Sequence, residues 1–210
     1  MRVFTGWIIA AAAVSLLSAC GPKGGAASGG TEMELGNPNA KVTVTEWASV
    51  TCPHCAAFNE EVFPAFKAKY VDTGKVHYVF REFLTPPASV AAAGFLVARC
   101  AGKDKYFSVI DAIFHSQAEL YNDPRGVLFR IGKGVGMTED QVTKCIQDEA
   151  GLKALNERVD AAIKKDNITG TPSFTVNGKK LDGQTLAGSV YNGGEISMAQ
   201  LDAALAPLLK

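Results

Sequence analysis

Two cysteines separated by two residues, Cys52 and Cys55, have the clearest potential for chemistry in this chain of 210 residues. They stand in the run Cys52-Pro53-His54-Cys55, directly after residues with strand character. A pair at this spacing can close a small disulfide ring, and a cysteine at the start of a helix meets backbone N–H groups that favour the thiolate. The motif therefore predicts thiol–disulfide redox chemistry with Cys52 as the nucleophile.

His54 stands between the two cysteines in the sequence, and its side chain would stabilise the Cys52 thiolate when it is protonated or donates a hydrogen bond. A stabilised thiolate is a good leaving group, and its disulfide is oxidising because reduction yields the stabilised product. The motif thus indicates a centre that passes its disulfide to a substrate. A structural disulfide and half of a zinc site are the alternatives. The sequence lacks the second set of ligands that structural zinc usually needs, so we expect no metal.

The elements around the motif follow from hydrophobic periodicity. Residues 42–48 and 75–83 alternate β-branched and aromatic residues, which predicts two strands. Pro53 suits the first turn of a helix, and the apolar residues after it recur at helical spacing until Gly74. The strand–helix–strand order implies parallel pairing of the two strands.

From residue 88 to residue 166 strand signals nearly vanish and apolar residues recur three or four apart, which predicts a helical insertion. Thr138 and Gln141 match a capping box at the start of one of its helices. Asn177-Gly178 between two short strand-like runs predicts a hairpin. A last helix is expected to begin near Ser197.

The N-terminus has the pattern of an export signal, with Arg2 followed by a short apolar run. The run ends in Leu17-Ser18-Ala19-Cys20, which resembles the lipobox of bacterial lipoproteins. We therefore expect a signal peptide over 1–19, a lipid on Cys20 and a flexible tether over 20–31. A plain signal peptide with an incidental cysteine and an uncleaved anchor are the alternatives. In enteric bacteria an aspartate directly after the lipidated cysteine retains a lipoprotein at the inner membrane. This sequence has Gly21 at that position, which favours a periplasm-facing protein of the outer membrane.

The 21 basic and 21 acidic side chains leave no net formal charge, so nucleic acid is not an expected partner. Export places the other cysteines in an oxidising compartment, where disulfides persist. One of three connectivities pairs Cys52 with Cys55 and leaves Cys100 with Cys145. Two buried free thiols at Cys100 and Cys145 are the alternative.

A strand with Glu46, followed by Cys-Pro-His-Cys opening a helix, resembles the DsbA family of periplasmic thiol oxidoreductases. The run Gly170-Thr171-Pro172-Ser173-Phe174 resembles the loop that faces the redox centre in this family. The resemblance implies an α/β, thioredoxin-like fold over residues 32–210 with an all-helical subdomain inserted at about 88–166. It also implies that Pro172 is cis beside the disulfide and that the Thr171 backbone pairs with an extended substrate peptide.

Glu46 resembles the buried acid of the wider family that assists proton transfer from the second cysteine, here Cys55. Its alternative is one polar face of an edge strand. His77 and His115 have no cysteine or acidic partner at motif spacing, so we expect ordinary roles in the fold for both.

The resemblance implies an enzyme without a cofactor that oxidises exported cysteine-containing proteins and is reoxidised by a membrane partner resembling DsbB. Thr171 also resembles the threonine of disulfide isomerases and reductases, so either of those activities is the alternative on the same fold. A lipoprotein that binds peptides or acts as a chaperone without catalysis is the alternative from another class.

Overall fold

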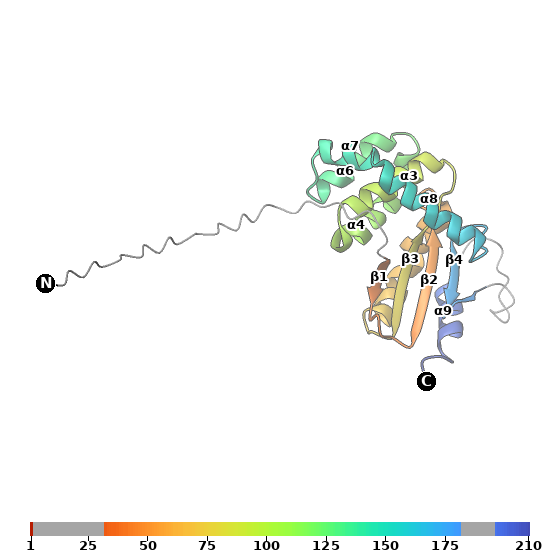
Figure 1. Cartoon of the computed structure of the whole chain (residues 1–210). Coiled ribbons are helices and arrows are strands. Elements are labelled where there is room, and N and C mark those ends of the chain that lie inside the picture. The colour runs from red at the N-terminus through yellow and green to blue at the C-terminus, as the bar shows by residue number, and fades with distance from the viewer. Residues whose placement is uncertain (2–31, 182–195) are drawn as a thin grey trace.

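The strands form one mixed sheet in the computed structural model, which describes residues 1, 32–181 and 196–210 (Figure 1). Within these residues the strand order is β1-β3-β2-β4-β5. The strands are β1 (Met33–Gly36), β2 (Val42–Ala48), β3 (Val76–Glu82), β4 (Ser173–Val176) and β5 (Lys179–Lys180). β2 and β3 are parallel, as the strand–helix–strand order predicts, and the other pairs are antiparallel. The strand that leads to the cysteine motif therefore lies inside the sheet.

The crossover from β2 to β3 is helical, but it is not the single regular helix that the periodicity predicts. Its segments are α1 (Pro53–Ala57), the π-helical η1 (Phe58–Val62), α2 (Phe63–Phe66) and the π-helical η2 (Lys67–Val71). Pro64 stands in the first turn of α2. A proline inside a helix removes one backbone donor and crowds the carbonyl four residues before it, and the wider turn of η1 relieves that crowding.

Aromatic rings of this crossover pack on the sheet and fix α1 against it. The ring centroids of Phe58 and Phe174 are 4.8 Å apart, and those of Phe63 and Tyr78 are 5.0 Å apart. Phe66 is fully buried in the same core. This packing holds the helix that carries Cys55 on one face of the sheet.

Six helices between β3 and β4 form the insertion, and Figure 1 shows them gathered at one end of the sheet. They are α3 (Ala88–Cys100), α4 (Lys103–His115), α5 (Gln117–Leu120), α6 (Pro124–Gly134), α7 (Glu139–Ile146) and α8 (Glu149–Lys164). Thr138 and Gln141 form the predicted capping box at the start of α7. Cys100 and Cys145 form a disulfide that joins α3 to α7, with their Cα atoms 6.0 Å apart.

The C-terminal elements follow the predicted order. Asn177 and Gly178 both have positive φ, at 49° and 77°, and form the hairpin turn between β4 and β5. The helix α9 (Met198–Leu205) begins at Ser197, which makes a capping box with Gln200. Asp202 accepts hydrogen bonds from the Tyr70 hydroxyl at 2.6 Å and the Lys69 ammonium at 2.8 Å, which attaches α9 to η2.

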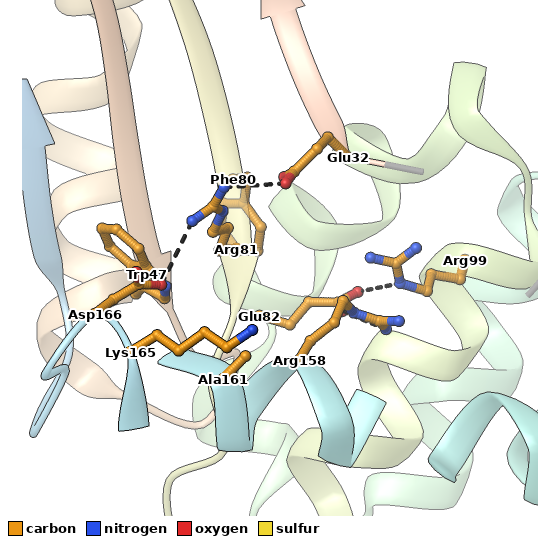
Figure 2. Close-up of a pocket in the computed structure, with 10 residues that line it drawn as sticks. All are labelled: Glu32, Trp47, Phe80, Arg81, Glu82, Arg99, Arg158, Ala161, Lys165 and Asp166. Carbon is orange, nitrogen blue, oxygen red and sulfur yellow. Dashed lines mark hydrogen bonds and ion pairs between the residues drawn. The ribbon is translucent and has the colours of Figure 1, made fainter. Parts of the chain in front are cut away.

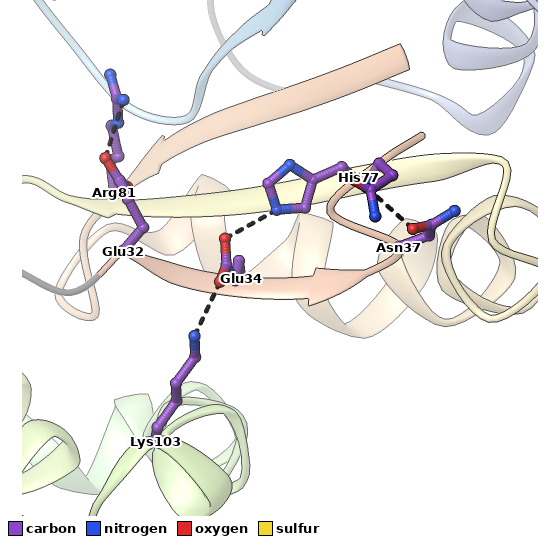
Figure 3. Close-up of polar contacts among 7 residues, drawn as sticks. Glu32, Glu34, Asn37, His77, Arg81 and Lys103 are labelled. Carbon is purple, nitrogen blue, oxygen red and sulfur yellow. Dashed lines mark hydrogen bonds and ion pairs between the residues drawn. The ribbon is translucent and has the colours of Figure 1, made fainter. Parts of the chain in front are cut away.

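The sequence patterns did not predict β1, which has only four residues and pairs along the outer side of β3. Polar contacts hold it there (Figure 3). The Glu34 carboxylate lies 2.9 Å from His77 Nε2 and accepts a hydrogen bond from the Lys103 ammonium at 2.8 Å. The Lys103 bond lowers the pKa of Glu34, with a smaller contribution from His77. Arg81 of β3 donates to Glu32, directly before β1, at 3.1 Å, so Lys103 connects β1 to the insertion and Arg81 connects this segment to β3.

Candidate active site

The redox motif begins where the chain leaves the end of β2 and turns into α1. The backbone N–H of Cys52 donates to the Ser49 carbonyl at 3.0 Å, and the N–H of Cys55 donates back to the Cys52 carbonyl at 3.1 Å. Cys52 is the N-cap of α1 and Pro53 occupies its first turn. A proline loses nothing there because the first N–H groups of a helix have no partner within the helix. Local sequence thus sets the sulfur of Cys52 at the start of a helix.

Cys52 is a free thiol whose pKa is lowered from 9.0 to about 5. The largest cause is a hydrogen bond from the Cys55 thiol, and the backbone N–H groups of Cys55 and His54 contribute further, while burial opposes the shift. The sulfur also lies 3.3 Å from the Thr171 carbonyl, to which the thiol form donates. At neutral pH Cys52 is therefore a thiolate.

Cys55 is in the opposite state. It is fully buried, and burial together with its bond to Cys52 raises the pKa of its thiol well above the usual value. The reduced site therefore pairs a thiolate at Cys52 with a protonated thiol at Cys55. This is the charge division expected of a nucleophile and its resolving partner.

Glu46 lies inside the sheet behind the two sulfurs. It is 2% exposed, and its carboxylate accepts a hydrogen bond from the Tyr78 hydroxyl. Burial raises the pKa of Glu46 to about 8, with a smaller contribution from the charge of Cys52. β2 lies between β3 and β4, so the interpretation of Glu46 as the polar face of an edge strand is wrong.

A cavity of about 320 Å³ reaches the Glu46 carboxyl between the sheet, the crossover helix and α4. Polar side chains of Asn59, Ser108 and Asp111 line it, and the Asn59 amide donates to Asp111 at 2.9 Å on the exposed side. Most of the remaining lining is apolar, but these polar side chains offer water partners inside the cavity and so give buried Glu46 a route for proton exchange with solvent.

The loop before β4 brings Thr171 and Pro172 against Cys52, across 119 residues of sequence. The Thr171–Pro172 peptide bond is cis and Pro172 is buried. The Thr171 hydroxyl is buried and, with Cys52 as a thiol, has no partner within residues 32–181 and 196–210. It lowers the pKa of Cys52 by donating to the thiolate. Deprotonation of Cys52 therefore satisfies a polar group that otherwise lacks an acceptor.

Two residues that sequence reasoning did not select hold the backbone of the redox loop: Gln117 begins α5 and Tyr121 directly follows it. The buried Gln117 side chain donates to the carbonyls of Val50 at 2.9 Å and Cys52 at 3.1 Å. The Tyr121 hydroxyl donates to the Thr51 carbonyl at 2.5 Å. The insertion thereby satisfies loop carbonyls that would otherwise lack partners. Neither residue belongs to a recognisable motif, so the sequence carried no signal for this role.

The remaining predicted residues lie at the edge of the site or away from it. His54 is exposed on α1. His77 contacts Glu34 on β1, and the His115 ring lies 2.9 Å from the Asp111 carbonyl within α4, so neither histidine joins the cysteines. Cys20 and the expected signal and tether lie outside the described residues.

The described part of the chain contains no group of three or more His, Cys, Asp or Glu side chains arranged to hold a metal. In the same residues we find no helix whose length and apolar character would let it span a bilayer.

Comparison with known proteins gives consistent results. A family model described as thioredoxin matches residues 28–189. A Rickettsia bellii protein named as a protein-disulfide oxidoreductase is 35% identical over 158 residues, covering 74% of this chain and 60% of the relative. The crystal structure of alpha-DsbA1 from Wolbachia pipientis has a TM-score of 0.72 at 29% identity, covering 85% of this chain and 90% of that one. A protein-disulfide isomerase from Novosphingobium aromaticivorans has a TM-score of 0.69 at 25% identity, covering 85% and 97%.

The chain spans between 53% and 60% of the length of the Rickettsia relatives that it matches. The fold in these comparisons is the α/β thioredoxin-like fold with a helical insertion that the sequence predicts.

Proposed function

The chain is a DsbA-like member of the thioredoxin family, and on that premise we propose that it oxidises cysteine pairs of other proteins through the Cys52–Cys55 disulfide. The observation that carries this proposal is the pKa of Cys52, lowered to about 5. Stabilising the thiolate favours the reduced form of the enzyme, so its disulfide is a strong oxidant.

The reaction proceeds by two thiol–disulfide exchanges. A substrate thiolate attacks Cys52 Sγ, the bond to Cys55 Sγ breaks, and Cys55 leaves with the electron pair. The substrate's second thiolate then attacks its own sulfur in the mixed disulfide, and Cys52 leaves as the thiolate. The substrate loses two electrons to form its disulfide, and the enzyme gains two as the reduced pair.

The first exchange leaves a charge on Cys55 that the buried site does not tolerate, because burial raises the pKa of this thiol far above neutral pH. Glu46, with its pKa near 8, carries a proton at neutral pH and supplies it to Cys55. Solvent in the cavity beside Tyr78 restores the proton to Glu46. Reoxidation runs these proton steps in reverse.

The opposite direction of electron flow, reduction or isomerisation, is the second candidate. Thr171 before the cis proline supports it by its resemblance to isomerases and reductases, and the similar Novosphingobium aromaticivorans protein is named a protein-disulfide isomerase. The low pKa of Cys52 favours oxidation, because a reductase needs a disulfide that is harder to reduce.

We extend the proposal to location and partners. The run ending at Cys20 supports an exported, lipid-anchored protein that faces the periplasm, and Gly21 favours the outer membrane. Its substrates are then exported proteins with cysteine pairs. A membrane partner resembling DsbB reoxidises it, and an outer-membrane anchor would make this encounter harder than an inner-membrane one.

The test mixes oxidised full-length protein with an equimolar reduced peptide that carries two cysteines, and follows peptide disulfide formation by mass. We expect the wild type to oxidise the peptide fully, and we expect no oxidation by Cys52→Ser or Cys55→Ser, because neither variant can form the redox disulfide. The double variant Cys100→Ala, Cys145→Ala is the matched control because it keeps the redox pair. Absence of peptide oxidation by the oxidised wild type would refute the proposal.

The reduction potential of the Cys52–Cys55 pair separates the two directions. We expect a value nearer to about −120 mV, typical of a strong oxidant, than to about −270 mV, typical of thioredoxin. A value near the second figure would favour the reductase. Peptide binding that persists in Cys52→Ser, with no redox activity in the wild type, would instead favour the non-enzymatic lipoprotein.

A further inference from the structure

A second cavity, of about 310 Å³, lies on the face of the sheet opposite to α1. Side chains alternate between the two faces of a strand, so Trp47 points away from the face that its neighbour Glu46 shares with the crossover helix. The end of α8 forms the other wall of the cavity (Figure 2). This space is separate from the sulfur chemistry of Cys52 and Cys55.

Most of the charge around this cavity is already paired. The buried Glu82 carboxylate accepts from Arg99 Nε at 2.5 Å and from two nitrogens of Arg158 at 2.8 and 2.6 Å. Arg81 contacts Asp166 at 3.5 Å and Glu32 on its other side. These groups form a fixed frame.

Two side-chain donors at the cavity, the Trp47 indole and the Lys165 ammonium, have no partner among the described residues. The indole N–H of Trp47 is buried, with the residue 3% exposed, and it has no acceptor among the described residues. Lys165 makes no ion pair in the part of the chain that the structure describes. In Figure 2 the indole stands at the edge of the cavity beside Asp166, and the Lys165 side chain extends into the same space. A buried N–H without an acceptor costs free energy, which a ligand acceptor would recover.

The charges select the kind of acceptor. Four basic and three acidic side chains line the cavity, an excess of one positive charge. One negative charge on a ligand balances this excess, whereas a dianion would face repulsion from Glu82 and Asp166. The indole of Trp47 and the methyl group of Ala161 provide apolar surface for a short hydrocarbon part. The volume lies near the lower end of small-molecule sites, about 300 Å³.

We propose that this cavity binds a small monocarboxylate, whose carboxylate accepts the indole N–H of Trp47 and pairs with the ammonium of Lys165. The apolar part of the ligand lies against the indole and Ala161. A free short-chain acid and the C-terminal carboxylate of a peptide share this chemistry. The inference does not depend on the direction, or the existence, of thiol exchange at Cys52.

The test follows the indole N–H signal of Trp47 by nuclear magnetic resonance in the ¹⁵N-labelled full chain. The sequence has two tryptophans, so Trp7→Phe leaves Trp47 as the only source of that signal. The protein is titrated at constant ionic strength with butyrate, N-acetyl-alanyl-alanine, succinate and inorganic phosphate. We expect a saturable downfield shift with butyrate or with the peptide, and the tighter of these two identifies the source. Binding of succinate and phosphate should be at least tenfold weaker.

Lys165→Met removes the proposed charge partner, and Lys164→Met is the matched control because Lys164 pairs with Asp160 at 2.9 Å. We expect Lys165→Met to weaken carboxylate binding at least tenfold and Lys164→Met to leave it unchanged. No saturable shift with either monocarboxylate would overturn the proposal. Equal binding by Lys165→Met and wild type, or equal binding of dianions, would overturn it as well.

Discussion

The titration of Cys52 makes the stability of the reduced protein depend on pH in a defined direction. The pKa of this thiol falls from 9.0 to about 5 on folding. Between those values the unfolded chain binds a proton at Cys52 that the folded chain does not. The thiolate therefore stabilises the fold above the unfolded pKa, and that contribution is lost as pH falls through about 5. Cys52→Ser removes the effect and leaves the rest of the site.

The size of the effect follows from linkage, in which one pKa unit corresponds to about 1.36 kcal/mol. For a shift from 9.0 to about 5, the contribution lost between pH 7 and pH 5 is about 2.3 kcal/mol before screening. Substrate must reach the Cys52 sulfur, so solvent screens this charge, and we expect about 1 to 1.5 kcal/mol.

The assay is urea unfolding of the fully reduced wild type and of Cys52→Ser at pH 7 and pH 5. Glu46 titrates in both proteins, and its raised pKa acts with the opposite sign, stabilising the fold as pH falls. Subtracting the two unfolding free energies removes most of this contribution. The wild type should lose about 1 to 1.5 kcal/mol relative to the variant between pH 7 and pH 5. A difference that stays constant, or that grows as pH falls, would refute the assignment of a thiolate at Cys52.

Three further outcomes can be measured. Glu46→Gln should slow peptide oxidation about 100-fold at pH 7 and leave the rate of Cys52 alkylation unchanged. The difference in oxidation rate between wild type and variant should shrink above pH 8, because Glu46 then loses its proton. Equal oxidation rates at pH 7 would show that Glu46 does not supply the proton. Replacing Cys100 and Cys145 with alanine should lower the free energy of unfolding by about 4 kcal/mol for a 45-residue separation, and loss of peptide oxidation would contradict a purely structural disulfide. Gln117→Leu leaves two loop carbonyls without their donor and should lower the free energy of unfolding in urea by about 1 to 3 kcal/mol. An unchanged free energy of unfolding would show that these hydrogen bonds do not stabilise the loop.

Sequence patterns located the elements that depend on neighbours in the chain. β2 has the predicted bounds, and Thr138 and Ser197 cap their helices, because strand alternation and capping involve residues a few positions apart. The same patterns failed for β1, which is too short to show a period. They also failed for the crossover helix, where Pro64 follows a widened turn within a run that is otherwise regularly apolar.

The sequence by itself determined the nucleophile and its place at a helix start, since Cys52, Pro53 and Cys55 act through local geometry. The largest cause of the lowered Cys52 pKa, the Cys55 thiol, is local as well, and only the tertiary structure decided which distant groups surround that sulfur. Thr171 lies 119 residues away, and Gln117 braces the loop from 65 residues away. Burial, which depends on the whole core, divides the charge between the two cysteines. Only folding brings such distant groups together, and no periodicity in the sequence predicts which of them will be in contact.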